Sequence, residues 1–229
     1  MRKTKVCVSV YGGDEYELGR KVETALSRGG DLVEARLDLS GVSSWDRVYT
    51  ALKPFADRLI LTLRPVDEWG KSELSDSERL AVLSKLCGMR PAYVDVELKT
   101  ARSNSLEEIR RSGVKLIVSW HGAQTPETER LAETARECLQ HGDIAKVVCL
   151  SNGAEDNFKV LMLYTQMPPE KLVAFCMGEK GWITRIVSMA AGAPIAYASL
   201  DEAATGPGQL PLNEMLEVRD RIVKGVRGC

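Results

Sequence analysis

At 229 residues, of which 44% are hydrophobic, the chain is long enough to bury a sizeable core. Its 31 Lys and Arg residues balance 32 Asp and Glu residues, and the net charge of −1 argues against nucleic acid or an anionic membrane surface as a main partner. No stretch approaches the ~18 consecutive apolar residues of a membrane-spanning helix, so the sequence predicts none.

Eight short runs rich in β-branched residues are spaced along the chain and are typical of strands. They occupy residues 6–10, 33–38, 59–64, 93–98, 115–121, 144–150, 173–177 and 194–199. Segments of helical period lie between them, such as residues 16–27, 77–86 and 128–139. Strand and helix alternating eight times indicate parallel βα units.

Local signals mark the helix boundaries. Ser75 with Glu78, and Ser105 with Glu108, fit the capping box, in which the two side chains satisfy free backbone N–H groups. The pair Thr125-Pro126 predicts a capping oxygen before a proline at the first helical position. Glycines predict the helix ends, at positions 29–30, 88, 113 and 142.

The architecture predicted from this pattern is a single α/β domain, a (β/α)8 barrel that spans residues 1–229. A doubly wound open sheet is the alternative arrangement of parallel βα units. We favour the barrel because no strand has the polar character of a sheet edge.

The compartment follows from the N-terminus and the cysteines. Residues 1–10 are basic and then apolar, but the apolar part is too short for a signal peptide and ends at Gly12-Gly13. The six cysteines lie far apart without a CxxC pair, so we expect small buried hydrophobic residues rather than disulfides or metal ligands. These features predict a reducing, cytoplasmic compartment.

Polar residues interrupt several of the predicted strands at alternate positions, which share one face. If these faces all point into the barrel, its centre holds Glu34, Arg36, Arg64, Glu97, His121 and Lys146. Burying such groups unpaired costs several kcal/mol each, so they must pair with one another or bind a polar ligand. A structural ion-pair network is one interpretation, and the position near the C-terminal strand ends favours an active site.

Lys146 is the strongest candidate for a catalytic residue, because apolar residues flank it within residues 143–150. Burial and a neighbouring arginine, Arg36 or Arg64, would keep the amine partly uncharged, so that it can attack a ketone and form a Schiff base. Pairing with Glu97 or Glu34 is the structural alternative. His121, one strand earlier, would then serve as general acid–base, whereas we interpret His141 as a helix-end cap.

Two further segments follow the last strands. Arg185, in a predicted helix, either clamps a carboxylate through two parallel hydrogen bonds or is a solvated helix residue. Residues 205–209 form either a plain turn or a lid that carries Gln209 over the site.

Together these pieces resemble the type I 3-dehydroquinate dehydratases. The matching stretches, in the family's order, are EAR (34–36), TLR (62–64) with Glu68, SWH (119–121), DIAK (143–146), MGEKGWITR (177–185) and PGQ (207–209). The resemblance implies a (β/α)8 lyase without cofactor or metal, often a homodimer, that converts 3-dehydroquinate to 3-dehydroshikimate.

The resemblance also implies residue roles. Lys146 would form an imine with the C3 ketone, His121 would remove the C2 proton and return a proton to the departing hydroxyl, and Glu68 would orient His121. The implied substrate-binding residues are Ser9, Glu34, Arg36, Arg64, Arg185, Thr205 and Gln209.

Two other functions fit parts of the pattern. A Schiff-base aldolase on the same barrel would share Lys146 but would not need Arg185 and Gln209. A non-catalytic barrel that binds a small anion would need the carboxylate site but would form no covalent adduct.

Overall fold

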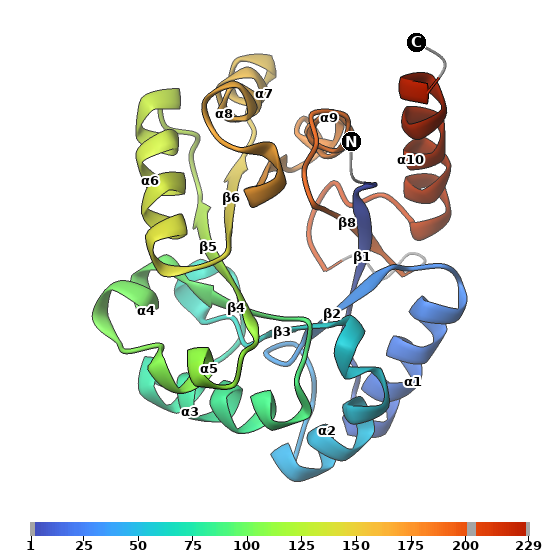
Figure 1. Cartoon of the computed structure of the whole chain (residues 1–229), viewed down its shortest axis with the longest axis vertical. Helices are drawn as coiled ribbons and strands as arrows, with labels where there is room; N and C mark the ends of the chain where they lie inside the picture. Colours follow the sequence, from blue (N-terminus) through green and yellow to red (C-terminus); the bar gives the residue numbers. More distant parts are fainter. Residues whose placement is uncertain (1–2, 201–204, 228–229) are drawn as a thin grey trace.

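Eight parallel strands form one sheet that is nearly closed into a barrel, with helices outside it (Figure 1). The computed structural model describes residues 3–200 and 205–227. The strands are β1 (Lys5–Val10), β2 (Leu32–Arg36), β3 (Leu59–Thr62), β4 (Tyr93–Glu97), β5 (Lys115–Gly122), β6 (Ile144–Leu150), β7 (Leu172–Met177) and β8 (Ile195–Ser199). Their order runs from β7 down to β1 and then to β8, so the predicted barrel is confirmed and the doubly wound sheet is wrong.

Helices and short 3-10 turns connect the strands and surround the barrel. They are α1 (Glu15–Ser27), α2 (Trp45–Leu52), η1 (Lys53–Arg58), η2 (Val66–Glu68), α3 (Asp76–Leu86), η3 (Cys87–Met89), α4 (Leu98–Ser103), α5 (Glu107–Arg111), α6 (Thr128–His141), α7 (Ala154–Leu161), α8 (Leu163–Gln166), η4 (Pro169–Lys171), α9 (Trp182–Ala190) and α10 (Leu212–Arg227). Within the described ranges, no helix has the length and hydropathy of a membrane span.

Apolar residues form two layers, one between the strands and helices and one inside the barrel. The inner layer includes Leu32, Ile60, Ile117 and Ile144, each two residues before the polar position of its strand. Because alternate residues share a face, Glu34, Thr62, Ser119 and Lys146 lie directly above these apolar side chains. The apolar layer thus closes the barrel below, and the polar residues lie toward the C-terminal strand ends.

The cysteines behave as the sequence predicts within the described chain. Five are free and buried, and Cys229 lies outside the described residues. Burial raises the pKa of the Cys138, Cys149 and Cys176 thiols to about 12, so these side chains act as small hydrophobic groups.

Only one of the three predicted helix starts has the expected cap. The Ser75 hydroxyl accepts from the Glu78 N–H at 3.4 Å, and the Glu78 carboxylate accepts from the Ser75 N–H at 2.8 Å, so this capping box is confirmed. The capping box at Ser105 is wrong, because α5 begins at Glu107 and the Glu108 carboxylate instead accepts from the Ser84 hydroxyl.

The cap predicted at Thr125 is also wrong. Helix α6 begins at Thr128, with Glu127 at its N-cap position. The Thr125 hydroxyl instead donates to the Leu150 carbonyl at 3.0 Å and ties the loop after β5 to the end of β6. A contact distant in sequence has replaced the local one.

We predict that Ser75→Ala lowers the free energy of unfolding by about 1 kcal/mol, because α3 loses its side-chain cap. Ser105→Ala is the matched control and should cost less than about 0.5 kcal/mol, since its capping box does not form and, among the described residues, its hydroxyl accepts only the exposed Glu107 N–H at 3.3 Å. Urea denaturation measures both, and equal losses would contradict the assignment.

Candidate active site

A cavity of about 410 Å³ opens at the C-terminal ends of the strands. The ten residues to which the sequence analysis gave catalytic or binding roles line it: Ser9, Glu34, Arg36, Arg64, Glu68, His121, Lys146, Arg185, Thr205 and Gln209. They come from four strands, β1, β2, β5 and β6, and from the segments that follow β3, β7 and β8. Glu97, which the sequence also placed at the barrel centre, does not line the cavity.

Lys146 lies at the centre of this set and is only 5% exposed. Its Nζ lies 2.9 Å from Asp95 Oδ2 and 3.2 Å from Glu34 Oε1, and 4.3 Å from the centroid of the Tyr197 ring. The alternative pairing with Glu34 is therefore present, whereas Asp95 replaces Glu97. The nearest charged groups are carboxylates, and these stabilise the ammonium rather than the uncharged amine that the sequence led us to expect.

Glu34 is a fully satisfied buried carboxylate. It accepts from the Ser9 hydroxyl at 2.7 Å and the Thr62 hydroxyl at 3.0 Å, besides Lys146. Burial opposes its ionisation, but Lys146 and Arg36 outweigh burial and lower its pKa. Glu34 therefore stays ionised beside the amine.

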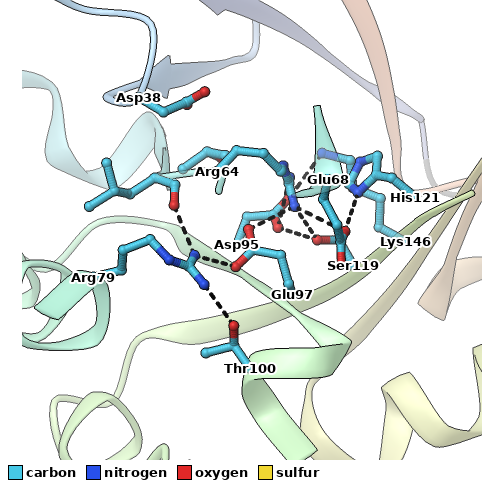
Figure 2. Close-up of polar contacts among 12 residues, drawn as sticks. Asp38, Arg64, Glu68, Arg79, Asp95, Glu97, Thr100, Ser119, His121 and Lys146 are labelled. Atoms are coloured by element: carbon cyan, nitrogen blue, oxygen red, sulfur yellow. Dashed lines mark hydrogen bonds and ion pairs between the residues drawn. The ribbon is translucent and has the colours of Figure 1, made fainter. Parts of the chain in front are cut away.

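Arg64, just beyond β3, links the acidic residues of β4 (Figure 2). Its Nη1 donates to Glu97 Oε1 at 2.9 Å and to the Ser119 hydroxyl at 2.7 Å, and its Nη2 lies 3.1 Å from Asp95 Oδ1. Arg36 instead pairs with Asp38 through two hydrogen bonds of 2.9 and 2.8 Å. The two arginines that the sequence placed beside the amine are thus held by carboxylates.

His121 and Glu68 form a hydrogen-bonded pair, with His121 Nδ1 2.9 Å from Glu68 Oε2. Burial, Arg64 and Lys146 lower the pKa of His121 well below its usual value. Burial raises the pKa of Glu68 to about 8, with Arg64 opposing and Glu97 adding to the rise. The imidazole is therefore neutral near pH 7, and the pair gives up its shared proton through Glu68 at higher pH.

Arg185 is a buried cation of the cavity that has no carboxylate partner among the residues the structure describes. It is 2% exposed, so the alternative of a solvated helix residue is wrong. Its Nη2 donates to the Pro207 carbonyl at 3.4 Å, and the guanidinium lies 4.2 Å from the Phe175 ring centroid. Its Nε and Nη1 have no partner among the described residues, and burial lowers its pKa to about 10. An anion in the cavity would satisfy these donors.

The segment after β8 reaches the cavity. Gln209 Oε1 accepts from the Thr205 N–H at 2.8 Å and the Thr205 hydroxyl at 3.2 Å. Gly208 has φ +75°, and a Cβ there would lie 2.6 Å from the Gly178 carbonyl oxygen. Only glycine therefore lets this segment pack against the turn after β7 and bring Gln209 to the site.

The sequence did not single out every residue of the cavity and of its charge network, and Asp95, Tyr197 and Phe175 are among those it did not. Asp95 contacts Lys146 directly, while Tyr197 and Phe175 line the wall beside Lys146 and Arg185. Asp95 shares a strand face with Glu97, and that alternation was the available signal. The sequence has no such signal for the two aromatic residues, because an apolar residue that lines a cavity cannot be distinguished from one in the core of a buried strand.

Metal-binding geometry is absent from the part of the chain that the structure describes. No three His, Cys, Asp or Glu side chains there are grouped as metal ligands. The charged groups of the site bind one another instead (Figure 2).

Comparison with known proteins yields matches over most of the chain. Residues 6–223 match the type I 3-dehydroquinase family. The chain is 36% identical over 197 residues to the 3-dehydroquinate dehydratase of Pyrococcus abyssi, covering 85% of this chain and 88% of that one. It is 40% identical over 200 residues to that of Thermococcus onnurineus, covering 86% and 89%.

Solved structures show the same fold. The crystal structure of 3-dehydroquinate dehydratase from Geobacillus kaustophilus superposes with a TM-score of 0.85 at 24% identity, covering 97% of this chain and 92% of that one. The enzyme of the same name from Aquifex aeolicus gives a TM-score of 0.79 at 29% identity, covering 95% and 98%.

We predict that the His121–Glu68 pair releases a proton with an apparent pKa of about 8. Below this pH the pair holds the extra proton and His121 Nε2 is protonated. Above it, the Glu68 carboxylate accepts from Nδ1–H and Nε2 carries a free lone pair. The chain has two histidines, so ¹⁵N NMR can follow the His121 ring directly. Glu68→Gln should abolish the step, and an imidazole that titrates near 6.5 in both proteins would refute the assignment.

Proposed function

Because the chain belongs to the type I 3-dehydroquinase family, we propose that it is a 3-dehydroquinate dehydratase, a lyase that removes water from 3-dehydroquinate to give 3-dehydroshikimate. One observation carries the proposal: a buried amine, Lys146, and a buried guanidinium with free donors, Arg185, face one cavity. The substrate has a ketone for the first and a carboxylate for the second. The catalytic domain spans residues 1–229.

The first step is imine formation at Lys146. The ammonium gives a proton to a neighbouring carboxylate, and Asp95 and Glu34 lie within 2.9 and 3.2 Å. The free amine adds to the C3 ketone, and the carbonyl oxygen leaves as water after protonation. The resulting protonated imine keeps its positive charge next to the same two carboxylates, which stabilise it as they stabilise the ammonium.

The second step is elimination, with His121 as base. The imine cation withdraws electrons from C2, and His121 Nε2 takes the C2 proton to give an enamine. The enamine expels the C1 hydroxyl, and His121 returns a proton to it as water leaves. Addition of water to the imine then frees the product and the amine. The step needs a neutral imidazole with a free Nε2, the form in which the Glu68 carboxylate accepts from Nδ1–H. Burial, Arg64 and Lys146 keep the ring neutral by lowering the pKa of His121.

The substrate carboxylate binds Arg185, joined by Gln209 and Thr205. The unpartnered Nε and Nη1 of Arg185 support this assignment, because a carboxylate accepts two parallel N–H bonds from a guanidinium. The ring hydroxyls and ketone bind Ser9, Glu34, Arg36 and Arg64, all of which line the cavity.

The resemblance further supports a cytoplasmic homodimer that works without cofactor or metal. The five free, buried cysteines agree with a reducing compartment. Sedimentation of the purified chain would measure the oligomeric state.

We predict that the protein converts 3-dehydroquinate to a conjugated enone, seen as a rise in ultraviolet absorbance. His121→Ala should lower kcat by about 10²- to 10⁴-fold, because the general base is lost. His141→Ala is the matched control: this histidine ends α6 and does not line the cavity, so its removal should leave kcat unchanged. No enone from the wild-type protein would reject the proposed function.

We also predict that Arg185→Met raises KM by about 100-fold, the effect of truncating one partner of a buried charge pair. The thermal midpoint should not fall, because the variant removes a buried charge that has no carboxylate partner in the described chain. Arg185→Lys should give an intermediate KM. An unchanged KM in Arg185→Met would remove Arg185 from the site.

A further inference from the structure

Arg79 reaches the buried charge network from outside the barrel (Figure 2). It belongs to α3 and is 1% exposed. Its Nη1 donates to Glu97 Oε2 at 2.5 Å and the Leu63 carbonyl at 3.0 Å, and its Nη2 donates to Asp76 and to the Thr100 hydroxyl, both at 2.7 Å. Neither Arg79 nor Glu97 lines the cavity, so Arg79 cannot act on a substrate directly.

Two short chains of contacts connect Arg79 to the reacting groups. Glu97 binds Arg79 through Oε2 and Arg64 through Oε1, the latter at 2.9 Å. From Arg64, one chain leads through Asp95 to Lys146. The other leads to Glu68, whose Oε2 lies 4.0 Å from Arg64 Nη1 and 2.9 Å from His121 Nδ1.

Among the buried charges of this cluster, cations and carboxylates are equal in number only when Arg79 is included; its other carboxylate partner, Asp76, is partly exposed. The cations Arg64, Arg79 and Lys146 face the carboxylates of Glu34, Asp95 and Glu97, while burial favours the neutral forms of Glu68 and His121. Without Arg79, Glu97 would keep a single cation in a buried setting. Arg64 would then sit among a different set of neighbouring charges.

We propose that Arg79 is a positioning residue which, by binding Glu97, holds Arg64 at the point where it serves both Asp95 beside Lys146 and Glu68 beside His121. The part of this inference that concerns turnover rests on the proposed function. The part that concerns the His121–Glu68 pair does not.

Removal of the Arg79 charge has a directional consequence. Burial already raises the pKa of Glu97, although Arg64 and Arg79 oppose the rise and Asp95 adds to it. In Arg79→Met the pKa of Glu97 therefore rises further, and Glu97 carries less negative charge. The groups that face Glu68 are Arg64, Glu97, Asp95, Asp67 and His121. A smaller negative charge on Glu97 makes Glu68 ionise at lower pH.

The test compares wild type, Arg79→Met and Arg79→Lys by ¹⁵N NMR of His121, with His141 as internal reference, and by steady-state kinetics on 3-dehydroquinate. In Arg79→Met, proton release by the His121–Glu68 pair should move to lower pH by about half a unit or more. The value of kcat should fall about tenfold or more with KM nearly unchanged, since the cavity wall is intact. Arg79→Lys should lie between the two.

Two variants separate positioning from simple support of α3. Asp76→Asn changes the contact of the Arg79 guanidinium with Asp76, on the side away from Glu97. It should not shift the pH at which the His121–Glu68 pair releases its proton. The double variant Arg79→Met/Glu97→Gln has a neutral side chain at position 97, so its His121 titration should shift to lower pH at least as far as in Arg79→Met, and it remains informative if Arg79→Met does not fold. An unmoved or upward-shifted titration in folded Arg79→Met would overturn the inference. So would a titration in Arg79→Lys, which keeps the cation, that shifts as far as in Arg79→Met. Failure of wild type to dehydrate the substrate would reject only the proposed function.

Discussion

Lys146 is buried as an ammonium between two carboxylates, and the rest of the site is arranged around that interaction. An uncompensated ammonium inside the barrel would cost several kcal/mol, so Asp95 and Glu34 must lie within ion-pair distance. These carboxylates would be equally costly alone, and Arg64, Ser119, Ser9 and Thr62 satisfy them. These groups come from strands β1 to β6 and from the segment after β3, so only the closed barrel brings them together.

The two buried guanidinium groups in the cavity wall differ in their partners. Both terminal nitrogens of Arg64 contact carboxylates, whereas Arg185 keeps two buried nitrogens without partners among the described residues. In the proposed function a ligand carboxylate completes these donors. Arg185 is then the proposed binding site of the substrate carboxylate, and Lys146 the proposed site of reaction with its ketone.

Much of the fold and of the site can be predicted from the sequence, because both depend on the local periodicity of apolar and polar residues. Strand bounds and the inward faces follow from alternation, and Glu34, Arg64, His121 and Lys146 interrupt apolar runs at positions that share a face. The sequence does not predict which charged side chains form ion pairs with each other. Asp95 rather than Glu97 contacts Lys146, and Thr125 binds Leu150 rather than capping α6. Those choices depend on strand register and on contacts distant in sequence, as does the reach of Arg79 from α3 to β4.

The most direct test of the central claim is to find the covalent bond itself. The protein is incubated with 3-dehydroquinate, reduced with borohydride and digested, and the peptide masses are measured by mass spectrometry. If the buried, ion-paired amine is the nucleophile, the added mass lies on the peptide that contains Lys146. An adduct on a different lysine, or full turnover without any adduct, would contradict the assignment.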